Sequence, residues 1–177
     1  MPSRYYFLSS LPMLNFDEKA PISWEKFIED AKGNINQTDY KELCAIAENK
    51  KSGSHFLKKW ESLNCKLDQS INFQRRKNLG REIDSQDKTA FREFEIEQVT
   101  QAVMSAKNPL ESEMVLMKFK YDYLEREKGF DAFTKNALLS YALQLKILLR
   151  KDLFTTEAGN KQYNQLFDKL QKEMKME

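Results

Sequence analysis

The chain has 177 residues, of which 41% are hydrophobic, 12% aromatic and 32% charged, and its formal net charge is +2. This composition argues against a disordered chain and provides enough length to bury a hydrophobic core. With only five glycines and four prolines, the sequence favours long helices with charged outer faces. Two cysteines, Cys44 and Cys65, are too few for a disulfide scaffold, so we expect a cytoplasmic protein.

The first apolar stretch, YYFLSSLP at residues 5–12, lacks the form of a secretory signal. Such a signal needs an unbroken apolar run of about 7–15 residues, whereas Ser9, Ser10 and Pro12 interrupt this one. No other stretch approaches the roughly 18 apolar residues of a membrane-spanning helix, so we expect no direct membrane insertion. We expect the segment to be extended or partly helical, to end at Pro12 and to pack on the fold through Tyr5, Phe7, Leu8 and Leu11.

Two helices are predicted in the region that follows. Ser23 can cap a short helix from Trp24 to about Ala31, which Gly33 would close. Thr38 can cap the next helix. The expected apolar face of that second helix consists of Tyr40, Leu43, Cys44 and Ala47.

A long helix is predicted after Ser54. Apolar residues keep helical spacing up to about Leu79, and Gly80 is a natural stop. Its expected core face consists of Phe56, Trp60, Leu63, Leu67 and Ile71.

Residues 91–106 are ambiguous, because Phe94 and Ile96 alternate with glutamates as they would in a strand. A helical face is also present, and no turn residue interrupts the run. We therefore predict a helix here, with an apolar face made of Phe91, Phe94, Val99, Ala102 and Val103.

Two further helices have clear start signals. Asn108 is an expected cap with Pro109 at the first helical position, and this helix should stop at Gly129. Thr134 should cap a helix that is apolar nearly all round, and we expect it to be the central, most buried one.

A last helix is predicted near the C-terminal end. It carries an apolar stripe, and its polar end, QKEMKME, is expected to fray. The stripe consists of Tyr163, Leu166, Phe167, Leu170 and Met174. The sequence thus predicts an all-α bundle of about six or seven helices in a single domain, residues 1–177, with 1–82 and 83–177 as possible halves.

No residue pattern predicts catalysis, a cofactor or a bound metal. A metal site needs about four suitable ligands, and the only histidine, His55, lies ten residues from Cys65 on one helix, which is about 15 Å of rise. We interpret His55 as a helix-end surface residue and both cysteines as core packing. The segment NKKSGSH lacks the order of a phosphate-binding loop. We therefore expect a protein that is not an enzyme; carboxylate chemistry in an unrecognised pocket is the remaining enzymatic alternative.

The charge is unevenly distributed, with +6 over residues 44–81 and −4 over residues 82–97. Four cations gather at the end of the long helix: Arg75, Arg76, Lys77 and Arg81. They suit the negative end of the helix dipole, and they also suit an acidic partner or phosphates. No aromatic residues interleave with them for base stacking, so we expect no nucleic acid and place a protein contact here. Lys146 and Arg150 need partners if they are buried, and Glu113 is one candidate.

Several segments together resemble a small bacterial family of uncharacterised function that is encoded among the subunits of V/A-type ATPases. They are YYFLSSLP, LDQSINFQRRKNLGR, NPLESEMVLMKFKYDYLE and NALLSYALQLKILLRKDLF followed by GNKQYNQLFDKL. The family is similar to a reduced relative of the ATPase C subunit, called d in eukaryotic enzymes. That subunit is an all-helical, non-catalytic piece that joins the central stalk to the membrane rotor ring.

The resemblance implies a non-catalytic adaptor or central-stalk-like accessory subunit that works by protein–protein contact. Stalk or rotor subunits of the ATPase would be its partners, at the cytoplasmic face of the membrane. Outside the complex, the charged surface favours a monomer. The alternative is a module that binds nucleic acid or an anionic surface through residues 75–81.

Overall fold

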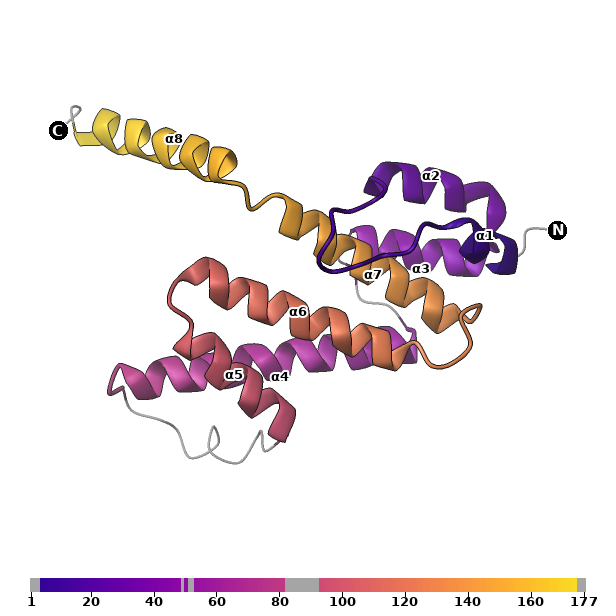
Figure 1. Ribbon diagram of the computed structural model, residues 1–177, viewed down its shortest axis with the longest axis horizontal. Coiled ribbons are helices and arrows are strands. Elements are labelled where there is room, and N and C mark those ends of the chain that lie inside the picture. Colours follow the sequence, from indigo (N-terminus) through magenta and orange to yellow (C-terminus); the bar gives the residue numbers. More distant parts are fainter. Residues whose placement is uncertain (1–3, 49, 51–52, 82–92, 175–177) are drawn as a thin grey trace.

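The computed structural model describes residues 4–48, 50, 53–81 and 93–174. Every regular element in this part of the chain is an α-helix, as predicted, and there are eight of them (Figure 1). The number is higher than expected because the aromatic N-terminal segment forms a helix of its own. The helices are α1 (Arg4–Ser10), α2 (Trp24–Asn34), α3 (Gln37–Ala47), α4 (His55–Asn78), α5 (Phe94–Ser105), α6 (Pro109–Glu127), α7 (Lys135–Asp152) and α8 (Thr156–Met174).

Helix α7 is the centre of the arrangement, as its apolar sequence predicted. Helices α1, α2 and α3 pack along one side of it, and α6 and α4 contact it from the other side (Figure 1). Helix α5 packs against α4 and α6 at the far edge. Helix α8 extends away from this body beyond the end of α7. None of the helices described is long and apolar enough to cross a membrane.

The core has two parts. The larger surrounds α7, where Leu138, Leu139, Leu145 and Leu148 are completely buried. A smaller cluster joins α4 to α5 and contains Leu63, Leu67 and Ile96. Trp60 of α4 packs against both clusters and so connects them.

The helix boundaries follow from local capping in most places. The side chains of Ser23, Asn108 and Thr134 each accept a hydrogen bond from the first turn of their helix, as the sequence predicted. Gly80 and Gly129 have φ angles of +63° and +82° just beyond α4 and α6. Glycine reaches this left-handed region without steric cost, which explains both helix ends.

Two predicted helix boundaries in the N-terminal region are wrong. Asn36, not Thr38, caps α3, because its Oδ1 atom accepts a 2.7 Å hydrogen bond from the Asp39 amide. Thr38 therefore lies inside the first turn. Gly33 does not close α2 and instead lies within its last turn, since the helix continues to Asn34.

The N-terminal segment is helical from Arg4 and packs mainly through Phe7, which is 2% exposed. Leu8 and Leu11 pack against the larger core, as expected. Tyr5 does not: it is 52% exposed, and its ring centroid lies 4.2 Å from that of the exposed Phe133. The helix ends at Ser10, two residues before the predicted stop at Pro12.

Among the other predictions of burial, those for Phe94 and Cys65 are wrong and that for His55 is confirmed. The predicted face of α5 is wrong at Phe94, which is 70% exposed, because Ile96, Thr100 and Val103 form the buried face. Cys65 is exposed rather than packed in the core, while Cys44 is partly buried. His55 lies exposed at the start of α4, as expected. Phe91, which was also assigned to the α5 face, lies outside the described residues, as does the end of QKEMKME beyond Met174.

Candidate functional site

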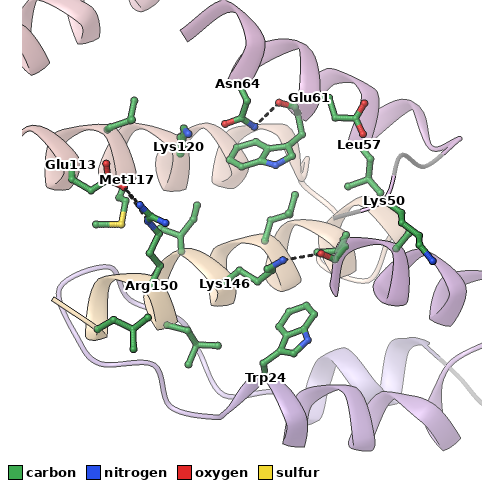
Figure 2. Close-up of a pocket in the computed structure, with 18 of the residues that line it drawn as sticks. Trp24, Lys50, Leu57, Glu61, Asn64, Glu113, Met117, Lys120, Lys146 and Arg150 are labelled. Atoms are coloured by element: carbon green, nitrogen blue, oxygen red, sulfur yellow. Dashed lines mark hydrogen bonds and ion pairs between the residues drawn. The ribbon is translucent and has the colours of Figure 1, made fainter. Parts of the chain in front are cut away.

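A wide groove lies between the two sides of the helical body. It has a volume of about 1130 Å³ and lies between α2 and α3 on one side, α4 and α6 on the other, with α7 at its base (Figure 2). We call it the central groove. Its apolar lining includes Trp24, Leu57, Trp60, Leu116, Met117 and Leu149.

Lys146 extends from α7 into the central groove and is held there by α2 and α3. Its Nζ atom donates a 2.8 Å hydrogen bond to the Ile46 carbonyl oxygen and lies 5.6 Å from the centroid of the Trp24 ring (Figure 2). Burial lowers the pKa of Lys146 from its ordinary value, because the charged form loses contact with water. The lysine therefore fixes α7 against the N-terminal helices.

Arg150, one turn further along α7, pairs with Glu113 of α6, the candidate partner that the sequence analysis gave for Lys146 or Arg150. The guanidinium Nη2 atom lies 2.9 Å from Glu113 Oε1, and the Nε atom donates a second hydrogen bond to the same oxygen at 3.0 Å. Arg150 also lies 5.7 Å from the centroid of the Phe154 ring, just after α7. This pair holds the opposite wall of the groove to its base.

Lys120 of α6 is the third cation that points into the groove (Figure 2). Burial lowers its pKa, and the nearby carboxylates of Asp68 and Glu113 partly offset this effect. It makes no hydrogen bond to any described residue. In all, four cationic and four acidic side chains line the groove: Lys50, Lys120, Lys146, Arg150, Glu25, Glu61, Asp68 and Glu113.

The equal numbers of cationic and acidic side chains indicate which kind of ligand the groove could bind. A site that concentrates anions would have an excess of one sign, whereas this one combines an apolar base with a mixed charged rim. Such a surface fits the apolar face of a protein segment. Within the described ranges, no three histidine, cysteine or acidic side chains cluster in a way that could hold a metal ion.

The predicted partner-binding residues lie elsewhere. Arg75, Arg76, Lys77 and Arg81 are all exposed at the end of α4, and none of them lines the central groove. Arg75, Lys77 and Arg81 form no ion pair with any residue that the structure describes. The adjoining acidic run has six acidic residues, of which three lie in residues 82–92, outside the described residues. Two of the three described members pair elsewhere: Glu93 with Lys66, and Glu95 with Arg126.

A second unusual surface lies along α8, the helix that projects from the body (Figure 1). Tyr163, Leu166 and Phe167 are 67%, 60% and 49% exposed, although they share one face of the helix. The rings of Tyr163 and Phe167 stack with their centroids 6.2 Å apart. We call these three residues the α8 stripe. The predicted stripe also included Leu170 and Met174, whose side chains lie outside the described residues. The sequence did not predict that the stripe is uncovered, because periodicity shows that a face is apolar without showing what packs on it.

The central groove was not predicted from the sequence. Its lining comes from five helices in different parts of the chain, and no local sequence motif indicates a groove of this kind. The one available signal was the pair of basic residues on the apolar α7, since buried cations require partners.

One comparison with known proteins gives a match. Residues 92–174 match a family model whose description is "Protein of unknown function (DUF2764)". No curated protein and no solved structure shows a significant similarity to this chain. The matched region contains α5, α6, α7 and α8, including the α8 stripe, and begins after α4 has ended. Residues 92–174 are therefore a DUF2764 domain, a family domain of unknown function.

Proposed function

We propose that this protein is a non-catalytic helical adaptor that works by protein–protein contact, as an accessory subunit of a bacterial V/A-type ATPase. The observation that carries the contact role is the central groove. It combines two tryptophans, Trp24 and Trp60, with aliphatic side chains at its base and charges of both signs at its rim. An amphipathic helix of a partner, with apolar residues three and four apart, would fit such a groove.

The sequence resemblance described above supports the choice of assembly. The C subunit that the family resembles joins helical stalk subunits to the rotor ring, and a groove for helices suits that task. In this proposal the basic end of α4, at Arg75–Arg81, is a second contact that faces acidic residues of a stalk subunit. The protein would then lie peripherally at the cytoplasmic face of the membrane without inserting into it.

An affinity pull-down from native membranes tests this proposal. The tagged protein is used at low and high salt, and the co-purifying chains are identified. We expect ATPase stalk or rotor subunits in stoichiometric amounts. Leu153→Glu, which adds a charge at an exposed position of the groove, should abolish their recovery.

Leu110→Glu is the matched control, because Leu110 is also exposed but lies outside the groove. It should leave recovery unchanged. Absence of every ATPase subunit at both salt concentrations would overturn the assignment to that assembly.

Binding to nucleic acid or to an anionic surface is the second candidate function. It is favoured by the exposure of Arg75, Lys77 and Arg81 without ion pairs among the described residues. Under this reading, affinity should fall steeply with salt, with a slope of log affinity against log salt of about −0.9 per phosphate contacted on duplex DNA. Replacing Arg75, Arg76, Lys77 and Arg81 with glutamine should remove that slope. The same replacement at the exposed Lys26, Lys32, Lys41 and Lys58 is the control.

A further inference from the structure

We propose that the central groove of one copy of this protein receives the α8 stripe of a second copy, and that two copies exchange α8 reciprocally. The inference rests on one part of the proposed function, the groove as a helix-binding surface. It does not rest on the assignment to an ATPase. It also predicts a dimer, whereas the surface charge led us to expect a monomer outside the complex.

The exposed apolar face of helix α8 would be stabilised by packing against another surface. The helix has 19 residues, and Tyr163, Leu166 and Phe167 on its apolar face remain 67%, 60% and 49% exposed. Most helical stability in proteins comes from packing of an apolar face, so a helix whose apolar face is uncovered lacks most of that stabilisation. A stripe with two aromatic rings is also costly to leave in water.

The central groove offers the matching surface. Its apolar lining includes Trp24, Leu57 and Leu149, and it extends to Leu153, the first residue after α7. Aromatic and aliphatic residues on both sides would interdigitate, and the charged rim would remain in contact with water. One molecule thus carries an exposed apolar helix face, the α8 stripe, and also an open apolar groove, the central groove.

The geometry of the α7–α8 connection prevents α8 from reaching the groove of its own chain. The Leu153 amide donates to the Arg150 carbonyl at 3.2 Å, and the Phe154 amide donates to the Lys151 carbonyl at 3.0 Å. The Arg150 guanidinium lies over the Phe154 ring. These contacts direct α8 outward from the body (Figure 1). Folding back over α7 would break them, whereas a second copy can be reached without any change at the connection.

A reciprocal exchange also reaches a sufficient size. A Tyr or Phe side chain contributes about 150–250 Å² when fully buried, and Tyr163 and Phe167 are 67% and 49% exposed. A two-fold arrangement makes the contact twice, and each groove loses a similar area from its own lining. The total then approaches the roughly 1,200–2,000 Å² of a stable interface.

The first test measures the molar mass of the full chain in solution by light scattering over a range of concentrations. We expect a dimer, at twice the 20.9 kDa of the chain, that dissociates on dilution. The double variant Tyr163→Glu/Phe167→Glu should raise the dissociation constant about tenfold or more. Asn164→Glu/Gln165→Glu adds the same charges away from the stripe and should leave the dimer intact. A monomeric wild-type protein at all concentrations would overturn the proposal.

The second test identifies what covers the α8 stripe. Two chains lacking Cys44 and Cys65 are mixed, one with Leu166→Cys in α8 and the other with Asp68→Cys at the groove, and oxidised in air. We expect a disulfide that joins the two different chains. Asp168→Cys, on the opposite side of α8, should not form it. If Leu166→Cys chains link only to each other, the two α8 helices pair directly and the groove is not the docking site.

These tests are separable from the test of the proposed function. A stable dimer without any recovered ATPase subunit would remove the ATPase assignment and leave the exchange standing. Recovery of ATPase subunits by a protein that is monomeric throughout would do the opposite.

Discussion

Helices α7 and α8 follow each other in the chain and have nearly the same length, 18 and 19 residues, yet their surroundings are opposite. Leu138, Leu139, Leu145 and Leu148 of α7 have no exposed surface. Leu166 of α8, also a leucine in an apolar stripe, is 60% exposed. The two helices therefore show how the same residue type acts in a covered and an uncovered position.

The difference shows that a sequence can form a helix with an apolar face without that face being buried by the rest of the fold. Helix α7 is apolar nearly all round and needs neighbours on every side, which α1–α4 and α6 supply. Helix α8 has an apolar face only, and Tyr163, Leu166 and Phe167 on that face are exposed. Each prediction below compares a covered group with a matched uncovered one, except the last, which follows a covered group alone.

The largest expected effect comes from the two leucines. Leu145→Ala should lower the free energy of unfolding by about 2–5 kcal/mol, because it removes buried methyl groups and leaves a cavity. Leu166→Ala should change it by less than about 0.5 kcal/mol, since little is buried there. Urea denaturation at concentrations where the chain is monomeric measures both. Equal losses would show that α8 packs on its own chain.

A buried ion pair gives the next comparison. The Asp39 carboxylate is almost completely buried and accepts a 2.7 Å hydrogen bond from Arg4 Nε. Arg4→Met should destabilise the fold by about 1–3 kcal/mol; this is less than for a fully buried pair, because the Arg4 side chain is partly open to water. Arg126→Met breaks the exposed pair with Glu95 and should cost about 0–1 kcal/mol. Thermal or urea unfolding of both variants checks the order.

A single buried hydrogen bond is expected to matter less. The hydroxyls of Ser70 and Thr100 lie 2.8 Å apart in the contact between α4 and α5. Thr100→Val should cost about 1–2 kcal/mol, because it leaves the Ser70 hydroxyl buried without its partner. The double variant Ser70→Ala/Thr100→Val should recover most of this loss. Ser105→Ala removes an exposed hydroxyl and should be nearly neutral; a comparable loss there would contradict the reading.

The smallest effect concerns high pH. Burial raises the pKa of Tyr121 and Tyr141 from 10.0 to about 12. Because the folded state holds these protons more tightly than the unfolded state, their contribution to stability is fully present below about pH 10. It is lost as the pH rises through about 12. Denaturation curves measured across this range should show the decline, and it should be shallower in Tyr141→Phe. A stability that stays constant up to about pH 12 would refute this.

Most helix boundaries were predictable because their causes are local. Asn108 and Thr134 cap helices through side chains that reach only three residues ahead, and Gly129 ends α6 through its own backbone angle. Thr38 was mistaken for a cap because Asn36, two residues earlier, offers the same chemistry. Capping residues that lie so close together cannot be ranked without the path of the chain before them.

Burial was less predictable, because it depends on distant segments. Phe94 and Ile96 are equally apolar, but α4 covers only Ile96. For the candidate site, Glu113 was predicted as one candidate partner for Lys146 or Arg150 if these cations were buried, and it pairs with Arg150, whose side chain is 62% exposed. Lys146 instead donates a hydrogen bond to the backbone carbonyl of Ile46, and the sequence does not show which carbonyl lies within its reach. The role of Arg75, Arg76, Lys77 and Arg81 stays a prediction.

The contact between α4 and α5 has a consequence for how the chain can be divided. Ile96 of α5 is covered by Leu63 and Leu67 of α4, and the family match begins at residue 92, after α4 has ended. A fragment cut at that boundary would present Ile96 and the hydroxyl of Thr100 to water. The stretch shared with the family is therefore not expected to be an autonomous folding unit. A fragment meant to keep α5 covered has to start no later than Ser54, and α7 additionally needs α1, α2 and α3 along one side.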